Sequence, residues 1–464
     1  MNQFPVLNDS GQKLADVCQD FYYEIKRGSG NYWMKNRDEY LPLSKADIKI
    51  HLADMGVRTS RQDGEWISQM DAALKHLQTK NCVKYAGSLA GYNAGRHTLL
   101  GNQILVTESA ILPVPKRGDW PLIKSILSNL LGEEQLPYLL GWLKVSLQSR
   151  YDSHHRSAQA IVFAGPRGCG KSFVQNHIIT PLFGGRAGKP YNWMAGNTNF
   201  NADLMEAEHL MIEDEVGDTT MKTRRQLGSQ LKLVTVNEVQ RCEGKYQQAI
   251  MLTPWWRLTL SINDEPENLS VLPPMDESLE DKIMLFLCEQ KSMPHPTTTD
   301  RQRKEFREKV ANELSHFAHY LTEDFSIPHG LECSRFGVKH YHHPELLARL
   351  NQLSPEMSLL ELIDMNPDAL FSEDTKKTED GLRVFSGTAQ EIERRLTGEY
   401  SQGRHIANKV FGRQTGNCGT YLGRIAKRLP NRVQRVPDTS KRQWIIIESP
   451  DVVGVGASPS TPSI

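Results

Sequence analysis

Long apolar segments are absent from this chain of 464 residues, and so is any imbalance of charge. No stretch of eighteen consecutive apolar residues occurs, which excludes a transmembrane helix. The N-terminus has no basic stretch followed by an apolar one, so it predicts no secretory signal. Lysine and arginine total 55, as do aspartate and glutamate, so the net charge indicates no class of partner. We therefore expect a protein without membrane contacts, whose partners are recognised by local patches.

Cysteine is scarce and dispersed. The chain has 7 cysteines, and no C-x-x-C pair is present. This pattern argues against a zinc ribbon and against a disulfide framework, so a reducing cytoplasm is the simplest compartment. A looser group joins Cys333 with His340, His342 and His343. Its spacing matches no standard zinc site, and we interpret it as a structural histidine-rich loop.

The most informative stretch begins at residue 161, where a short apolar run leads into a glycine-rich turn. The turn fits the P-loop pattern G-x-x-x-x-G-K-[ST], formed here by Gly165, Pro166, Arg167, Gly168, Cys169, Gly170, Lys171 and Ser172. Glycines let several backbone N–H groups point at one phosphate, and the helix that follows adds the positive end of its dipole. We expect Lys171 to contact the β- and γ-phosphates of ATP and Ser172 to bind Mg²⁺.

A second strand-like segment ends in acidic residues about forty residues after Lys171. The apolar run 210–212 is followed by Glu213, Asp214 and Glu215. In a nucleotide site one such carboxylate holds the Mg²⁺ shell, while another orients the attacking water. We assign Asp214 to the metal. Glu213 and Glu215 remain alternatives for the water, because strand alternation places both on the face opposite Asp214.

Two further features follow within about fifty residues. Two strand-like segments between residues 239 and 252 flank Lys245 and Tyr246, which predicts a hairpin with these side chains near its tip. The next strand, 257–262, is followed by Asn263. An amide at a strand end beside the γ-phosphate can sense whether that phosphate is present, so we predict a sensor role for Asn263.

In this order, the parts resemble the superfamily 3 helicases, an AAA+-related class of viral, plasmid and satellite-phage replication proteins. The resemblance covers about residues 120–330 and is nearest to the helicase half of phage and mobile-element primase-helicases. It implies an α/β fold with a P-loop AAA+-like ATPase core, ATP and Mg²⁺ as cofactors, a hexameric ring and a bacterial host cytoplasm. It also implies that Lys245 follows one DNA strand in the central pore, with Tyr246 beside it.

The sequence departs from this family in two places. The family has an arginine finger shortly after the asparagine strand, where Lys282 is the nearest basic residue and Arg335 is a second candidate. Larger relatives carry a primase domain with a pair of metal-binding carboxylates. No D-x-D motif occurs before residue 115, so we expect no priming activity.

Changes in composition divide the chain into six predicted segments. They are an α+β N-terminal region (1–115), a helical collar with its linker (116–157) and the ATPase domain (158–330). A helical connector (331–380), a winged-helix-like domain (381–449) and a disordered tail (450–464) follow. In the first segment, aromatic residues between 22 and 43 alternate with basic ones and could stack bases. A half-buried strand pair is the simpler interpretation.

The C-terminal segment is basic. Residues 381–448 include 13 lysines and arginines and 5 acidic residues. Three predicted helices followed by a two-strand hairpin resemble a winged helix, which would bind duplex DNA. The predicted contacts are one helix face and the wing, with Arg424, Lys427, Arg428, Lys441 and Arg442. Docking of another replication protein is the alternative for this segment.

These features favour an ATP-dependent DNA helicase that replicates a phage, a satellite or another mobile element. The main alternative is an AAA+-type switch or remodeller that binds DNA and ATP without unwinding. A small-molecule kinase would share the P-loop, but it would leave the lysine hairpin, the asparagine strand and the basic C-terminus unexplained.

Overall fold

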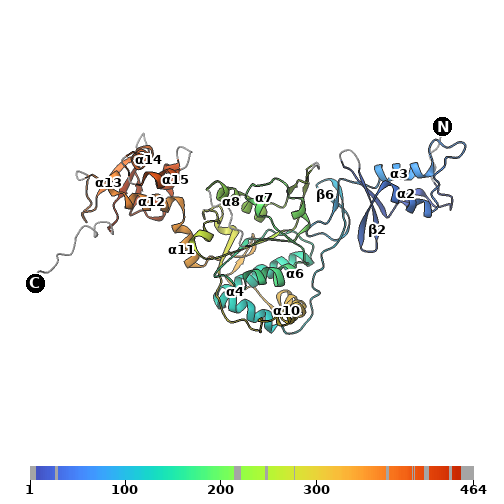
Figure 1. The fold of residues 1–464 in the computed structure, drawn as a ribbon, viewed down its shortest axis with the longest axis horizontal. Helices are drawn as coiled ribbons and strands as arrows, with labels where there is room; N and C mark the ends of the chain where they lie inside the picture. The colour runs from blue at the N-terminus through green and yellow to red at the C-terminus, as the bar shows by residue number, and fades with distance from the viewer. Residues whose placement is uncertain are drawn as a thin grey trace, which may run out of the picture. The chain divides into compact units, whose positions relative to one another are not determined.

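The computed structural model describes residues 7–26, 30–213, 221–245, 249–275, 277–372, 376–399, 401, 403–411, 417–437 and 442–450. The chain forms two compact units, Met1–Leu346 and Leu347–Ile464 (Figure 1). Within the described ranges, none of the helices combines the length and the hydrophobicity that a membrane span requires.

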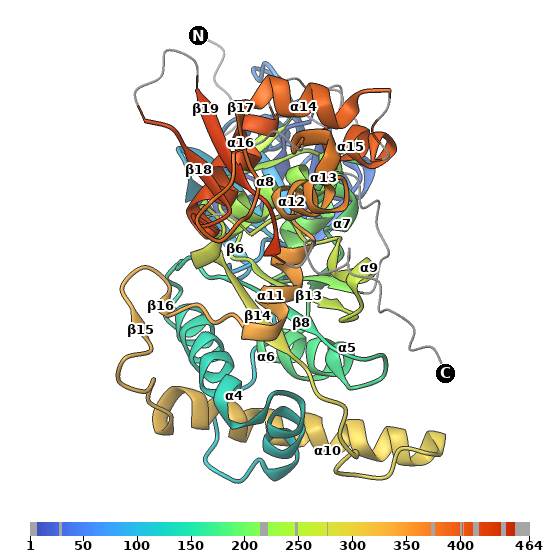
Figure 2. The ribbon, with the colours of Figure 1, turned by 90° about the vertical axis from the view of Figure 1, so that its left-hand side faces the viewer.

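The core of the larger unit is a five-stranded sheet in which every pairing is parallel. The strand order is β14-β8-β13-β10-β9, with bounds Ile283–Leu287, Ala160–Ala164, Arg257–Ile262, His209–Glu213 and Ala187–Gly188. Figure 2 shows β8, β13 and β14 running together through this unit. Because β13 lies between β8 and β10, the chain segments that follow these three strands meet at one edge of the sheet.

Helices cover both faces of this sheet. On one face, Ile161, Phe163 and Phe286 share a core with α4, α10 and the helical segment that follows β8. On the other face, α8 contacts β13. The bounds of these helices are Pro121–Tyr151 for α4, Asp300–His319 for α10, Met221–Val236 for α8, and Lys171–Val174, Gln175–Ile179 and Thr180–Leu182 for α5, the π-helical turn η1 and α6. This double cover explains why the strands read as continuous apolar runs in the sequence.

Two predicted helices between residues 120 and 145 form one element with a break. α4 is interrupted at Gly132, whose φ of 67° is left-handed, a conformation that glycine adopts without steric cost. The predicted helix at residues 297–325 is α10, continued by the π-helical turn η4, Tyr320–Asp324. The phenylalanine and leucine face predicted for that helix is buried against α4 and the helical segment that follows β8.

The outer edge of β14 is covered by other parts of the chain. Leu285 N–H donates to the Tyr341 carbonyl (2.8 Å), and the Leu285 carbonyl accepts from His343 N–H (2.9 Å). Further along, the Gln135 side chain donates to the Leu287 carbonyl (2.8 Å) and accepts from Leu287 N–H (2.9 Å). Backbone groups that would otherwise be available to another strand are therefore satisfied within this chain.

Two small sheets precede α4. Their orders are β3-β2-β1-β4 and β5-β7-β6, with bounds Glu39–Leu43, Asn31–Asn36, Phe21–Glu24 and Cys82–Val83, then Tyr85–Gly87, Asn102–Val106 and Gly95–Leu99. The predicted capped helix is α2, Lys45–Asp54, in which Ser44 and Asp47 form a capping box. Tyr32 is buried, and the cross-strand neighbours Tyr22 and Trp33 are half-buried, so the half-buried strand pair is confirmed.

The smaller unit packs its helices against a three-stranded antiparallel sheet. The sheet order is β17-β19-β18, with bounds Val384–Thr388, Gln443–Ile447 and Val433–Arg435. The helices are Pro355–Met365, Pro367–Leu370, Ala389–Thr397, Arg404–Phe411 and Asn417–Arg428, labelled α12 to α16. Leu359 and Phe371 share one core with Phe385 and Trp444, so helices placed in the predicted connector 331–380 belong to this unit. The sequence pattern did not indicate β17, which contains Ser386 and Gly387, residues of low strand propensity.

The remaining elements are short. They are α1 Leu14–Val17, α3 Gln69–Thr79, α7 Tyr191–Met194, η2 Ala202–Glu206, β11 Gln240–Cys242, β12 Ile250–Leu252, α9 Pro266–Leu269, η3 Glu280–Lys282, β15 Glu332–Cys333, β16 Gly337–Val338 and α11 Pro344–Gln352.

Candidate functional site

The glycine-rich loop, residues 165–170, joins β8 to α5 as predicted. Gly168 and Gly170 have φ values of 80° and 111°, which side chains with a Cβ rarely adopt. A Cβ at position 165 would collide with the Cys288 carbonyl oxygen. These backbone constraints explain the glycines and form a tight turn at the N-terminus of a helix, which suits an anion.

Lys171 is buried at the centre of this turn, with 4% of its surface exposed. Its Nζ donates to the carbonyls of Gly165 (2.6 Å) and Pro166 (3.0 Å) and to Oδ1 of Asn263 (3.2 Å). Asn263 comes directly after β13, which pairs in parallel with β8. The structure therefore brings together two residues that the sequence placed 92 positions apart.

β10, the strand with the acidic end, terminates beside the same loop. Glu213 is the last residue of β10, and its Oε1 accepts a hydrogen bond from Asn176 Nδ2 (2.8 Å). The same Nδ2 donates to the Ser172 carbonyl (2.9 Å), and Lys189 pairs with Glu213 at 3.4 Å. Asp214 and Glu215 lie outside the described residues. The described carboxylate is thus linked through one amide to the helix that begins at Lys171.

Asn176 was not predicted as a site residue. It lies four positions after Ser172, so both residues are on one face of the helical segment. Helical spacing could have indicated it, but only once the acidic strand was known to lie on that side.

A small hollow lies beside the glycine-rich loop, with a cavity volume of about 20 Å³. Its lining combines residues of α4, the loop with α5, and the segment after β14: Ile126, Asn129, Leu130, Cys169, Gly170, Phe173, Glu289, Lys291, Ser292, Met293 and Pro294. This volume holds about one water molecule, so the hollow is an apolar notch beside the loop and not a formed pocket for a flat ring.

Cys169 has an unusual environment. A hydrogen bond from the buried Cys288 thiol, together with nearby Lys171, lowers the pKa of Cys169 to about 6 despite its partial burial. Burial raises the pKa of the Cys288 thiol well above 9.0. Near neutral pH, Cys169 is therefore a thiolate inside the glycine-rich loop, and Cys288 remains a thiol that donates to it.

We expect iodoacetamide to alkylate Cys169 before the other cysteines. Because the thiolate is the nucleophile, the rate should rise through about pH 6 rather than through 9.0, the ordinary value for a thiol. Mass spectrometry of digested protein after short exposures at several pH values measures this. Cys169→Ser should remove the fast modification. Equal labelling of Cys169 and the half-buried Cys82 near neutral pH would contradict the assignment.

The predicted lysine hairpin is present. β11 and β12 pair antiparallel, and Lys245 lies exposed in the loop between them. Asn201, which is 1% exposed, fixes the base of the hairpin by bonds to Glu243 N–H (2.8 Å) and the Arg241 carbonyl (2.8 Å). Tyr246 lies outside the described residues. The hairpin is therefore anchored at its base and presents Lys245 to solvent.

Both candidate finger residues bind one carboxylate. Lys282 Nζ is 2.6 Å from Asp281 Oδ1, and Arg335 contacts Asp281 Oδ2 at 2.8 Å. Burial alone would raise the pKa of Asp281, but Lys282 and then Arg335 hold it below its ordinary value. The Lys282 side chain is 13% exposed and that of Arg335 is 46% exposed, so Arg335 is the more accessible.

This ion-pair group lies away from the glycine-rich loop of its own chain. η3, which contains Asp281 and Lys282, precedes β14, and Ile283 pairs with Ala160 at the start of β8. The glycine-rich loop follows Ala164 at the other end of β8. Four residue steps along a strand span about 13 Å. Lys282 and Arg335 are thus placed at the amino edge of the sheet, and Lys171 at the carboxyl edge.

The residues of the smaller unit that are predicted to contact DNA are only partly exposed. Arg424 and Arg428 lie on α16 and pair with the buried Glu356 at 3.5 and 3.3 Å. Lys427 and Arg442 are exposed, and Lys441 lies outside the described residues. Arg424 and Arg428 therefore help to hold α16 on α12 as well as facing partly to solvent.

Comparison with known proteins identifies one family and several solved structures. Residues 163–292 match a family of unknown function (DUF5906), and no curated protein matches the sequence. An apo structure of the NrS-1 C-terminal region, form A, is 12% identical with a TM-score of 0.51, covering 94% of this chain and 99% of that one. A second apo structure of that region is 14% identical with a TM-score of 0.51, covering 94% and 98%.

These two likenesses show a shared fold over nearly the whole chain. A structure described as an active helicase, SCCmec type IV Cch, is 11% identical with a TM-score of 0.28, covering 88% of this chain and 74% of that one. This chain is thus a mixed α/β protein with a parallel sheet, similar in fold to the NrS-1 C-terminal region.

Proposed function

We propose that this protein is an ATP-dependent DNA helicase of a phage, satellite or other mobile element. The observation that carries the proposal is the contact between Lys171 and Asn263 at the edge of the sheet where Glu213 also lies. A buried ammonium group, a polar amide and an acidic strand end are the parts needed to bind a nucleoside triphosphate and to respond to its hydrolysis. The sheet order supports this, because it places Asn263 between the other two.

The residues present fit ATP and Mg²⁺. The loop between Gly165 and Gly170 has the conformation of a phosphate cradle, and Lys171 is held at its centre by carbonyls and an amide that phosphate oxygens could replace. Ser172 and Asp214 would hold the Mg²⁺, which would neutralise charge on the phosphates. The base would lie over the apolar notch lined by Ile126, Leu130 and Phe173. Glu213, held by Asn176, would orient the attacking water, with Glu215 as the alternative.

The position of the finger candidates supports a ring. Lys282 and Arg335 lie at the sheet edge opposite to Lys171, so neither could serve the site of its own chain without a large rearrangement. In a hexameric ring, the amino edge of one sheet would face the site of the neighbouring subunit. Arg335, as the more exposed of the two, is our choice for the group that acts on the neighbour.

DNA would contact two parts of the chain. Lys245, on its anchored hairpin, would bind the phosphates of one strand in the central pore, with Tyr246 beside it. The smaller unit would act as a winged helix on duplex DNA, with Lys427, Lys441 and Arg442 on phosphates and Arg424 and Arg428 positioning α16. An exposed lysine on a hairpin held at its base by Asn201 is the observation that favours translocation over simple binding.

Strand displacement on a forked duplex tests the proposal, with Lys245→Ala as the decisive variant. We expect this variant to keep its basal ATPase activity and to lose unwinding and DNA-stimulated turnover, because the pore loses its phosphate contact. Lys304→Ala is the matched control, since Lys304 is an exposed lysine on α10, remote from the hairpin. Both variants should be measured for ATPase activity with and without single-stranded DNA.

Each outcome of this experiment separates two functions. Unwinding by the wild type and the control, but not by Lys245→Ala, supports the helicase. DNA binding with ATP hydrolysis but no strand displacement by the wild type would replace it with the AAA+-type switch. Unchanged unwinding by Lys245→Ala would remove the pore role of the hairpin.

A further inference from the structure

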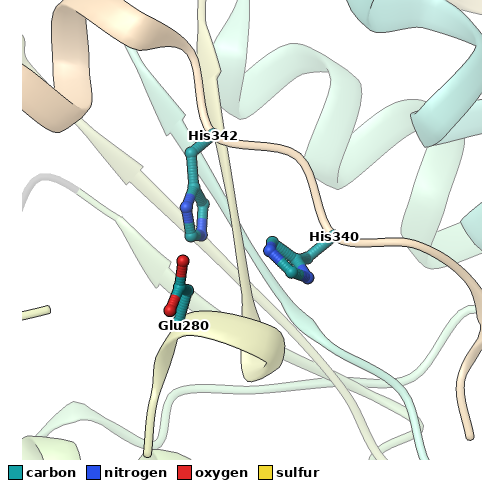
Figure 3. Close-up of side chains that lie close together, drawn as sticks. All are labelled: Glu280, His340 and His342. Carbon is teal, nitrogen blue, oxygen red and sulfur yellow. The ribbon is translucent and has the colours of Figure 1, made fainter. Parts of the chain in front are cut away.

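We propose that Glu280, His340 and His342 form a binding site for a divalent transition metal ion of the zinc class. One ligand atom from each residue lies within 4.8 Å of the others. Figure 3 shows the three side chains converging, with the Glu280 carboxylate directed at His342 and the His340 ring beside both. Two imidazoles and one carboxylate are a donor set that Zn²⁺ binds, with the fourth tetrahedral position left to water. The inference does not depend on the proposed helicase activity.

The backbone holds these ligands on two neighbouring segments. Glu280 begins η3, the turn that leads into β14. His340 and His342 lie on the segment bridged in parallel to β14 at Leu285, and residues two apart on an extended segment point to the same side. The two hydrogen bonds between this segment and Leu285 fix its register. The histidines therefore cannot slide relative to the turn that carries Glu280.

The side chains need little rearrangement to close around an ion. The rings of His340 and His342 have their centroids 5.0 Å apart. His342 Nε2 donates to the Ile283 carbonyl (3.0 Å), and this bond sets the rotation of the ring. Glu280 is exposed, so its flexible side chain can move to reach bond lengths of about 2.0–2.2 Å. Both imidazoles are partly sheltered from solvent, which favours coordination over hydration.

The donor types separate this site from a Mg²⁺ site. Mg²⁺ is bound by oxygen ligands and keeps several waters, whereas imidazoles suit zinc, copper, nickel and iron. The position also differs, since Glu280 lies at the amino edge of the sheet and Lys171 at the carboxyl edge. Sequence spacing could not reveal this group, because Glu280 precedes His340 by 60 residues.

A bound ion would tie η3 to the histidine segment. Asp281, next to Glu280 in that turn, binds both Lys282 and Arg335. The ion would therefore fix the turn whose carboxylate positions both basic side chains. A loss of metal should loosen this corner of the sheet without unfolding the glycine-rich loop at the opposite edge.

Cobalt titration of the full-length, chelator-treated protein tests the site. Co²⁺ should bind with visible d–d absorption of a tetrahedral nitrogen and oxygen site, without the near-ultraviolet band of a thiolate ligand, and Zn²⁺ should displace it. The double variant His340→Ala/His342→Ala should lose this spectrum. His343→Ala is the matched control, because the neighbouring residue points to the other side of the extended segment, and it should keep the spectrum.

A second variant keeps the test decisive even if the double variant misfolds. Glu280→Gln changes an exposed side chain, so its fold should be intact, and it should weaken zinc affinity by about tenfold or more. Zinc should raise the thermal unfolding midpoint of the wild type, and this shift should be smaller in Glu280→Gln. Three results would each overturn the site: no binding at micromolar cobalt, a thiolate band, or unchanged affinity in Glu280→Gln and in the double variant.

Discussion

Replacement of Lys171 by alanine is expected to reduce ATP hydrolysis by at least about 10²-fold, the usual loss when one preorganised donor to a developing negative charge is removed. Lys171 Nζ is the buried cation of the glycine-rich loop and already contacts Asn263. Without it, no ammonium group would stabilise charge on the β- and γ-phosphates. Steady-state phosphate release with saturating ATP and Mg²⁺ measures the effect.

Lys189→Ala is the matched control for this experiment. Lys189 pairs with Glu213 at 3.4 Å, but its side chain is 68% exposed, so its removal should change turnover only a few-fold. Asn263→Ala should retain nucleotide binding and lose turnover, because the amide would act only when the γ-phosphate is present. Wild-type rates in Lys171→Ala would refute the assignment of the glycine-rich loop as the nucleotide site.

Arg335→Ala is expected to lower ATP turnover by about 10³-fold or more if Arg335 acts as a finger on the neighbouring subunit. The reason is its location, since Arg335 lies at the amino edge of the sheet and its side chain is 46% exposed. Lys282→Ala should have a smaller effect, because Lys282 is more sheltered and acts on Arg335 only through Asp281. Arg301→Ala, an exposed arginine on α10, is the control and should be neutral.

Mixed rings distinguish action on a neighbour from action within a chain. Arg335→Ala and Lys171→Ala subunits, each inactive when it forms the whole ring, should regain activity when the two are mixed. A Lys171→Ala subunit has lost its own site but keeps its Arg335, so it should still support its neighbour. If Lys171→Ala regains no activity when mixed with Arg335→Ala or with Lys282→Ala, neither residue acts across an interface.

The sequence predicted the parts of the site that depend on local chain geometry. The glycine-rich loop, the lysine hairpin and the strand before Asn263 are each specified by residues within a few positions of one another, and all three are present. The structure adds the contact of Asn263 with Lys171, which arises because β13 and β8 are parallel neighbours. The roles of these residues, and of Asp214, Glu215 and Tyr246 outside the described ranges, remain predictions.

The features that the sequence did not predict depend on tertiary packing. The low pKa of Cys169 arises from Cys288, a residue that meets the loop only because β14 lies beside β8. The choice of Arg335 over Lys282 as the finger residue depends on the exposed fractions of the two side chains and on their shared partner Asp281, which only the structure gives. The histidine segment was interpreted as a structural loop because its spacing matches no standard zinc site, and Glu280, which is adjacent to it in space, lies 60 residues away in sequence.

The closed outer edge of β14 limits how copies of this chain can associate. Leu285 and Leu287 have their backbone groups bound by the histidine segment and by Gln135. Sheets of neighbouring chains therefore cannot merge through this strand into a continuous ladder, the arrangement that makes fibrils so difficult to separate. Contacts between copies at this side must be made by side chains, which can exchange partners without breaking a sheet. Such an interface is compatible with the proposed ring, whose subunits would rotate against one another and would separate to admit DNA.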